Sequence, residues 1–263
     1  MEFFSEIEKI LFTEDYNDKI NKLSNLDFDF FNHSHQILPL KPTYESFCKV
    51  VKPKNLPRRG FSNEIKKASL IHAILHIEYS AIDLALDACY RFRNMPESFY
   101  KDWLEVANDE VRHFKMLNEL LNKLGYKYGD FEVHNSLIEA GIKTNTLIER
   151  MAIVPRWLEA NGLDSNENII EKLKNYKNDE IAKKLIDILY VILEEEIPHV
   201  KKGDKWFKWS CDKENLESEK TYFEIVSKFY KNIQKPHLNI NARKEAGFSC
   251  NEIKKLARDE VEC

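Results

Sequence analysis

The stretch DEVRH, residues 109–113, decides the expected fold, because it contains the pattern Glu-x-x-His in Glu110 and His113. A second copy of the pattern closes the stretch EEIPH and is formed by Glu196 and His199. Residues three apart share one face of an α-helix, so each copy aims a carboxylate and an imidazole in one direction. A single copy arises often on a charged helix surface. Two copies on separate long helices instead predict two helices that face a common site.

Two further helices each offer one inward glutamate, Glu78 before the first motif and Glu159 before the second. Two Glu-x-x-His motifs and one glutamate from each of two other helices form the ligand set of di-iron and di-manganese carboxylate bundles. Four glutamates neutralise the four positive charges of two divalent ions, and oxygen ligands with one imidazole per metal suit iron or manganese better than zinc. The sequence therefore predicts two iron ions, with manganese or a mixed pair as alternatives. The six predicted metal ligands are Glu78, Glu110, His113, Glu159, Glu196 and His199.

Within this set the motif glutamates Glu110 and Glu196 are the candidate catalytic residues. The acidic residues that precede them, Asp109 and Glu195, are candidates for an outer shell. A metal-bound histidine usually donates its second N–H to a carboxylate, so we expect Asp109 to serve the histidine of the second motif and Glu195 that of the first. The alternative is a solvated carboxylate at each position.

Prolines lie inside the proposed ligand helices, and glycines are found at their expected ends. Pro155 and Pro198 fall inside them, and each predicts either a simple kink or a wider π-turn that re-aims a ligand. Gly125, Gly162 and Gly203 are expected to end helices. Apolar spacing and capping residues predict helices over 2–24, 62–93, 96–124, 146–162 and 178–202, with shorter ones over 135–140, 165–175, 215–232 and 249–261.

These helices predict an all-α chain with three parts. Residues 1–61 form a helix and an extended arm that packs on the bundle, residues 62–210 form a di-metal four-helix bundle, and residues 211–263 form a C-terminal helical extension. The apolar fraction of 43% and charged fraction of 32% are typical of a globular protein.

Composition also limits the cellular locations and the classes of partner that we expect. The net charge of −4 gives no global basic field for nucleic acid, and no apolar run reaches the roughly 20 residues needed to span a bilayer, so no membrane partner is expected. The first residues, MEFFSEIEKILF, lack the basic start of a signal peptide, so we expect a cytoplasmic location. The five scattered cysteines favour reduced thiols over a disulfide or zinc site.

Several stretches resemble an uncharacterised bacterial family of ferritin-like proteins, a domain of unknown function in the di-iron carboxylate superfamily. The similarity covers about residues 56–250 and includes LPRRGFSNEIKKASLIHAILHIEYSAIDLALDACYRF, PESFYKDWLEVANDEVRHFKML, LGYKYGDFEVHNSLIEA, RMAIVPRWLEANGLD, EEEIPHVKKGDKWF and NARKEAGF. The resemblance implies a ferritin-like fold and the same six ligands, but no substrate. Tyr79-Ser80 departs from the family pattern. Relatives of the family include a tRNA-modifying di-iron hydroxylase, to which the chain is distantly similar.

Three functions follow as alternatives. The first is an oxidoreductase that activates dioxygen or peroxide at two irons, such as a hydroxylase or monooxygenase, with an electron-donating reductase as partner. The second is iron binding or storage without an organic substrate, and the third is a metal-free interaction scaffold. The substrate is a small molecule or RNA, and a homodimer is an open alternative. An RNA surface would use basic and aromatic residues at 52–59 and 201–209, and the alternative there is an ordinary solvated surface.

Overall fold

A computed structural model describes all residues, 1–263, and the chain is all-α. It has no β-strand and only three isolated bridges. The chain divides into two compact units, Met1–Ile142 and Lys143–Cys263. The boundaries predicted from the sequence after residues 61 and 210 describe a bundle and its extensions, and they stay predictions.

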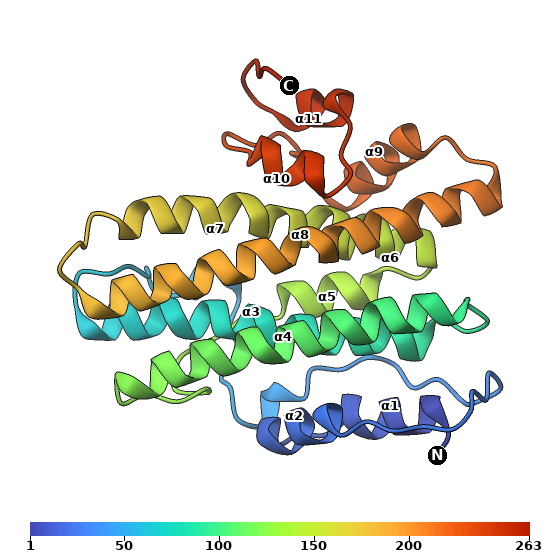
Figure 1. Ribbon diagram of the computed structural model, residues 1–263, viewed down its shortest axis with the longest axis horizontal. Helices are drawn as coiled ribbons and strands as arrows, with labels where there is room; N and C mark the ends of the chain where they lie inside the picture. The colour runs from blue at the N-terminus through green and yellow to red at the C-terminus, as the bar shows by residue number, and fades with distance from the viewer. The chain divides into compact units, whose positions relative to one another are not determined.

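The first unit is built on a long helical hairpin. Its α-helices are α1 (Phe3–Leu11), α2 (Tyr16–Ser24), α3 (Glu64–Arg91), α4 (Glu97–Lys123) and α5 (Ser136–Lys143), with 3-10 turns at Tyr44–Ser46 and Pro53–Asn55. Helices α3 and α4 lie side by side along their lengths (Figure 1). Asn63 caps α3 through its side chain, and Gly125 follows α4 with a φ of 78°, so the helix end predicted at Gly125 is confirmed.

Helix α3 is nearly buried all round. It is long and apolar enough to cross a membrane by length and composition alone, but 83% of its most apolar window is buried inside the protein. This burial is typical of a core helix.

The N-terminal segment packs on this hairpin as two helices, not one. The side chain of Asp15 accepts a hydrogen bond from the Asp18 amide and starts α2, which breaks the predicted helix over 2–24. The aromatic residues of the following arm are only partly buried. Phe28 and Phe31 are half-buried and pack on Phe3 with ring centroids 4.7 and 4.8 Å apart, whereas Phe30 is 56% exposed.

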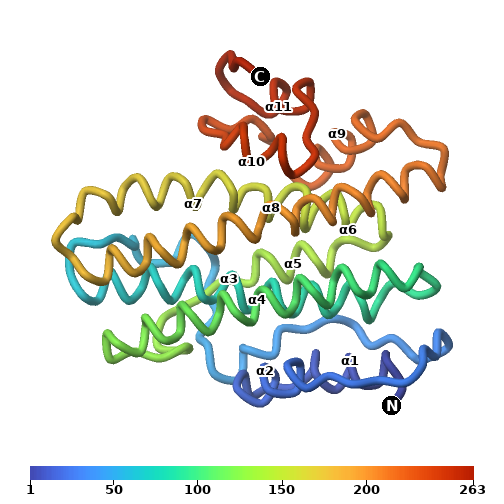
Figure 2. Tube along the Cα trace, in the orientation of Figure 1, coloured from blue at the N-terminus to red at the C-terminus, as the bar shows by residue number.

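The second unit contains two long helical runs. Its elements are α6 (Leu147–Ile153), a π-helix (Val154–Glu159), α7 (Ala160–Leu173), α8 (Glu180–Glu214), α9 (Ser218–Phe229), α10 (Ile240–Glu245) and α11 (Cys250–Leu256). The first three join end to end, and this run lies beside α8 in the Cα trace (Figure 2).

Two of the predicted helix ends in this unit are wrong. Gly162 lies inside α7 and Gly203 lies inside α8. Gly203 instead allows close packing, because a Cβ atom there would lie 2.3 Å from Cβ of Pro155. Glycine at this position brings the backbone of α8 against the π-helix.

The expectation for the cysteines is partly wrong as well. Cys250 and Cys263 form a disulfide with Cα atoms 5.6 Å apart, whereas Cys48, Cys89 and Cys211 are free and buried. The paired cysteines are 13 residues apart, a spacing that carries no motif. The C-terminal tail is therefore closed onto the start of α11.

Candidate metal centre

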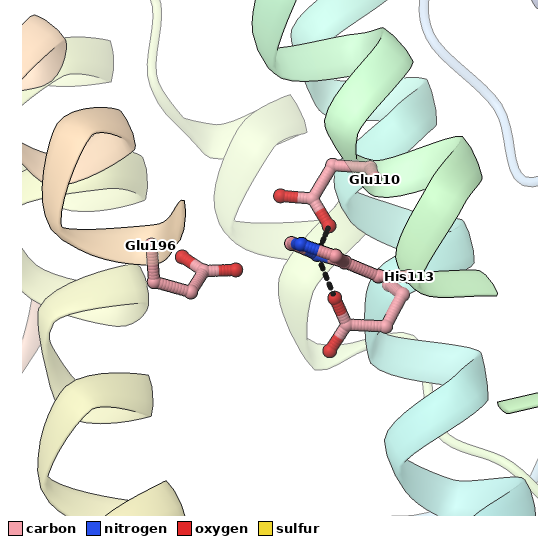
Figure 3. Close-up of side chains that lie close together, drawn as sticks. Glu110, His113 and Glu196 are labelled. Carbon is pink, nitrogen blue, oxygen red and sulfur yellow. Dashed lines mark hydrogen bonds and ion pairs between the residues drawn. The ribbon is translucent and has the colours of Figure 1, made fainter. Parts of the chain in front are cut away.

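The α3–α4 hairpin brings three of the predicted ligands together. Glu78 comes from α3, and Glu110 and His113 come from successive turns of α4. Nδ1 of His113 lies 3.0 Å from Oε2 of Glu78 and 3.3 Å from Oε2 of Glu110. Figure 3 shows Glu110 and His113 pointing toward one another. One potential ligand atom of each residue lies within 4.8 Å of those of the others, so these three residues could hold one metal ion.

The electrostatics of this cluster fit a cation. Glu110 and His113 have no exposed surface and Glu78 is 5% exposed. Burial, together with the neighbouring Glu110 carboxylate, raises the pKa of Glu78 to about 7. Burial lowers the pKa of His113, but its hydrogen bonds to Glu110 and Glu78 outweigh this and raise it to about 12. Two carboxylates buried this close require a positive charge, which a proton on the imidazole or a metal ion can supply.

The second Glu-x-x-His motif lies in the middle of α8. Glu196 and His199 are buried, whereas the neighbouring Glu194 is exposed. Nδ1 of His199 lies 3.8 Å from Oε2 of Glu196. The side chain of Glu196 extends from its helix in Figure 3. Glu196 is therefore more buried than Glu194 and the half-buried Glu195, as expected for the residue three before the histidine.

The remaining predicted ligand, Glu159, is the last residue of the π-helix. Its side chain is half-buried. The helix widens here because Pro155 has no N–H to continue the regular bonding pattern. The amide of Ala160 bonds back to the carbonyl of Pro155, five residues earlier. Of the two alternatives at Pro155, the structure has the π-turn, whereas α8 continues through Pro198 as an α-helix.

The outer-shell roles of Asp109 and Glu195 stay predictions. Asp109 accepts a hydrogen bond from Arg112 on its own helix at 2.9 Å. Glu195 is half-buried on α8. Other histidines near Glu78 are held elsewhere, since His72 accepts the amide of Gly129 at 3.0 Å.

Sequence reasoning missed a group of buried charges in the second unit. Arg156 and Arg243 have no exposed surface and pair with carboxylates far away in the sequence. Arg156 is 96 residues from its partner Glu252. No local pattern marks such pairs, although an arginine inside an apolar helical stretch, as in VPRW, is a signal that it needs a buried partner.

The family of the chain follows from comparison with known proteins. A family model described as "Protein of unknown function (DUF455)" matches residues 6–254. The chain belongs to the DUF455 family. An uncharacterized protein of Haemophilus influenzae is 43% identical over 212 residues, which cover 78% of this chain and 72% of that protein. No solved structure matches the chain.

The region matched by the DUF455 model includes all six predicted ligands and most of both compact units. The description of the DUF455 family names no activity.

Proposed function

We propose that this protein is a ferritin-like di-metal carboxylate oxidoreductase that uses iron and dioxygen or peroxide to oxidise a substrate. The observation that carries the proposal is the buried group of Glu78, Glu110 and His113, whose ligand atoms lie within 4.8 Å of one another. The second buried Glu-x-x-His motif, Glu196 and His199, supports a second ion. A buried carboxylate and imidazole on each of two helices are expensive to fold without a ligand.

In this proposal two ions are bound by the three residues of the α3–α4 hairpin, the two of α8 and Glu159. Glutamate oxygens neutralise the metal charge, and one histidine nitrogen per ion leaves positions for an external ligand. Bound iron would supply the electron transfer that the side chains cannot. The protein supplies the ligands, excludes water and controls protons. The raised pKa of Glu78 means that metal binding near neutral pH displaces a proton from the ligand cluster.

For the substrate we favour a small molecule over RNA. In the segment proposed for RNA contact, Trp206 is buried and Lys208 pairs with Asp204 at 2.7 Å. A buried indole cannot stack on a base. This observation weighs against RNA at residues 201–209, and the reductase partner remains part of the proposal.

Metal-dependent thermal stability tests the proposed site. Iron(II) under anaerobic conditions, or manganese(II), should raise the melting temperature of metal-free protein with increasing concentration, because the metal binds the folded state. Glu110→Ala should remove most of this rise, since it deletes a buried ligand. Glu194→Ala is the matched control, because it removes the same charge from an exposed position on a proposed ligand helix.

If metal raises the melting temperatures of Glu110→Ala and Glu194→Ala as much as that of the wild type, the proposed site is wrong. The metal-free scaffold then becomes the leading function. If metal binds as expected, exposure of the iron-loaded protein to oxygen, followed by optical spectroscopy, distinguishes an oxidising centre from passive iron binding.

A further inference from the structure

We infer that Arg156 is a positioning residue for the candidate ligand Glu159, and that the C-terminal helix α11 anchors it through Glu252. The inference rests on the proposed metal site. It gives the C-terminal part of the chain a role in metal binding that the ligand motifs alone do not suggest.

Arg156 joins three helical elements through charge. It lies in the π-helix, three residues before Glu159, and has no exposed surface. Its Nε forms an ion pair with Oδ1 of Asp204 on α8 at 2.8 Å. Its Nη2 donates to Oε1 of Glu252 on α11 at 2.9 Å. The second oxygen of Glu252 accepts the amide of Ser249 at 2.8 Å, so this carboxylate is itself held in place.

Aromatic rings enclose the same guanidinium. Its central carbon lies 4.2 Å from the ring centre of Tyr222, 4.7 Å from that of Phe248 and 5.1 Å from that of Phe207. The hydroxyl of Tyr222 also donates to the backbone carbonyl of Arg156 at 3.1 Å. Both the side chain and the backbone of Arg156 are therefore fixed, which restricts the π-helix at this point.

A second buried arginine fixes the chain on the other side of Glu159. Arg243, from α10, donates to the carbonyl of Ala160 at 3.1 Å and pairs with Asp164 at 2.6 Å. Glu159 thus lies between two residues whose backbone carbonyls accept hydrogen bonds from the C-terminal part of the chain.

The backbone geometry explains why this anchoring matters for a ligand. A π-helix is less stable than an α-helix and persists where other contacts hold it. A change from π to α geometry turns later side chains about the helix axis by up to about 100°. The tight contact of Gly203 with Pro155 holds α8 at a fixed separation from this turn. Loss of the Arg156 anchor would therefore change the direction of Glu159 relative to α8, which carries His199.

Manganese(II) binding to the full-length protein, measured by calorimetry, tests this inference. Arg156→Lys keeps the charge but cannot bridge Asp204 and Glu252 with a planar fork. We expect about 10- to 100-fold weaker binding, the usual effect of losing an outer-shell partner. Lys208→Met is the matched control, because Lys208 also pairs with Asp204 but forms no bond to the π-helix. It should bind manganese like the wild type.

A double-mutant cycle separates positioning from general damage. If Arg156 acts through Glu159, then Arg156→Lys should weaken manganese binding no further in a Glu159→Ala background. A purely structural role would weaken binding equally in both backgrounds and would overturn the inference. So would wild-type affinity in Arg156→Lys.

Glu252→Gln provides a second route to the same anchor if Arg156→Lys does not fold. It preserves the shape of the side chain and removes its charge, and we expect several-fold weaker manganese binding. Wild-type affinity in a folded Glu252→Gln variant would overturn the inference while leaving the proposed metal site intact. Absence of manganese binding by the wild type would instead overturn the proposed function and, with it, this inference.

Discussion

Two buried histidines of α3 show how single side chains make the fold sensitive to acid. Nδ1 of His76 accepts the hydroxyl of Tyr128 at 2.8 Å, and its Nε2 donates to the carbonyl of His134 at 3.1 Å. Nε2 of His72 accepts the amide of Gly129 at 3.0 Å. Burial lowers the pKa of His72 to about 4 and that of His76 to about 3. Both rings are therefore neutral in the folded protein at pH 5 and above.

These pKa values predict a loss of stability in mild acid. In the unfolded chain each ring takes up a proton near its ordinary pKa of about 6.5, so the unfolded state binds more protons than the folded one below that pH. The free energy of unfolding should fall by about 2 kcal/mol per histidine between pH 7.5 and pH 5. Urea unfolding at several pH values measures this. His76→Gln should make the decline less steep, and parallel curves for wild type and variant would contradict the assignment.

At the scale of elements, one buried ion pair attaches α2 to α3. Nζ of Lys19 lies 2.5 Å from Oδ1 of Asp83 and donates to Thr43 at 2.8 Å, and neither charged side chain has exposed surface. The ammonium group also lies 5.1 Å from the ring centre of Tyr79. Burial raises the pKa of Asp83, and the charge of Lys19 opposes this rise. Tyr79 is thus part of the surface on which α2 docks.

Removal of one partner should loosen this attachment. Lys19→Met leaves the Asp83 carboxylate buried without its cation, which typically costs about 3–5 kcal/mol of folding free energy. The double variant Lys19→Met/Asp83→Leu removes both charges and should recover most of that loss. Denaturant unfolding of both variants provides the comparison. If Lys19→Met unfolds at the wild-type denaturant concentration, the pair does not stabilise the N-terminal helices.

The helices show what local sequence could and could not predict. The second helix of the α3–α4 hairpin had a predictable end because Gly125 acts as a cap, and caps are local. The end of α8 was not, because Gly203 serves close packing against Pro155, a residue far away in the sequence. A glycine that ends a helix and one that admits a neighbouring backbone look the same in a single sequence.

The candidate site, too, was predictable from the sequence only in part. Glu110 and His113 were predictable from a spacing of three, and Glu78 as the inward glutamate of the helix before them. The anchors of the π-helix were not predictable, because Arg156 finds Glu252 only after the C-terminal helices have folded back. Helical periodicity identifies faces of one helix, but it does not identify which distant carboxylate will neutralise a buried cation.

For the whole molecule, the proposed ligands have a consequence for cooperativity. Three belong to the unit Met1–Ile142 and three to the unit Lys143–Cys263. If both units contribute ligands to one site, a bound metal links their unfolding, because neither can open without losing the metal's binding energy.

Hydrogen exchange measured by mass spectrometry tests this linkage. Adding manganese to metal-free protein should increase amide protection around the ligands of both α4 and α8. Helix α1 and helix α9, which carry no proposed ligand, serve as internal controls and should change less. An increase confined to one unit would contradict a site shared by both.

The π-helix Val154–Glu159 also has a consequence for the number of residues in this segment of the chain. A π-turn holds one residue more than an α-helix needs for the same path. Deleting one residue here would therefore leave an unbroken α-helix from α6 to α7, with the two ends in their present relative orientation. A homologue shortened by one residue at this segment would keep both helices and lose only the local widening that ends at Glu159. A gap of one position in a sequence alignment would then separate homologues that have this widened turn from those that share only the fold.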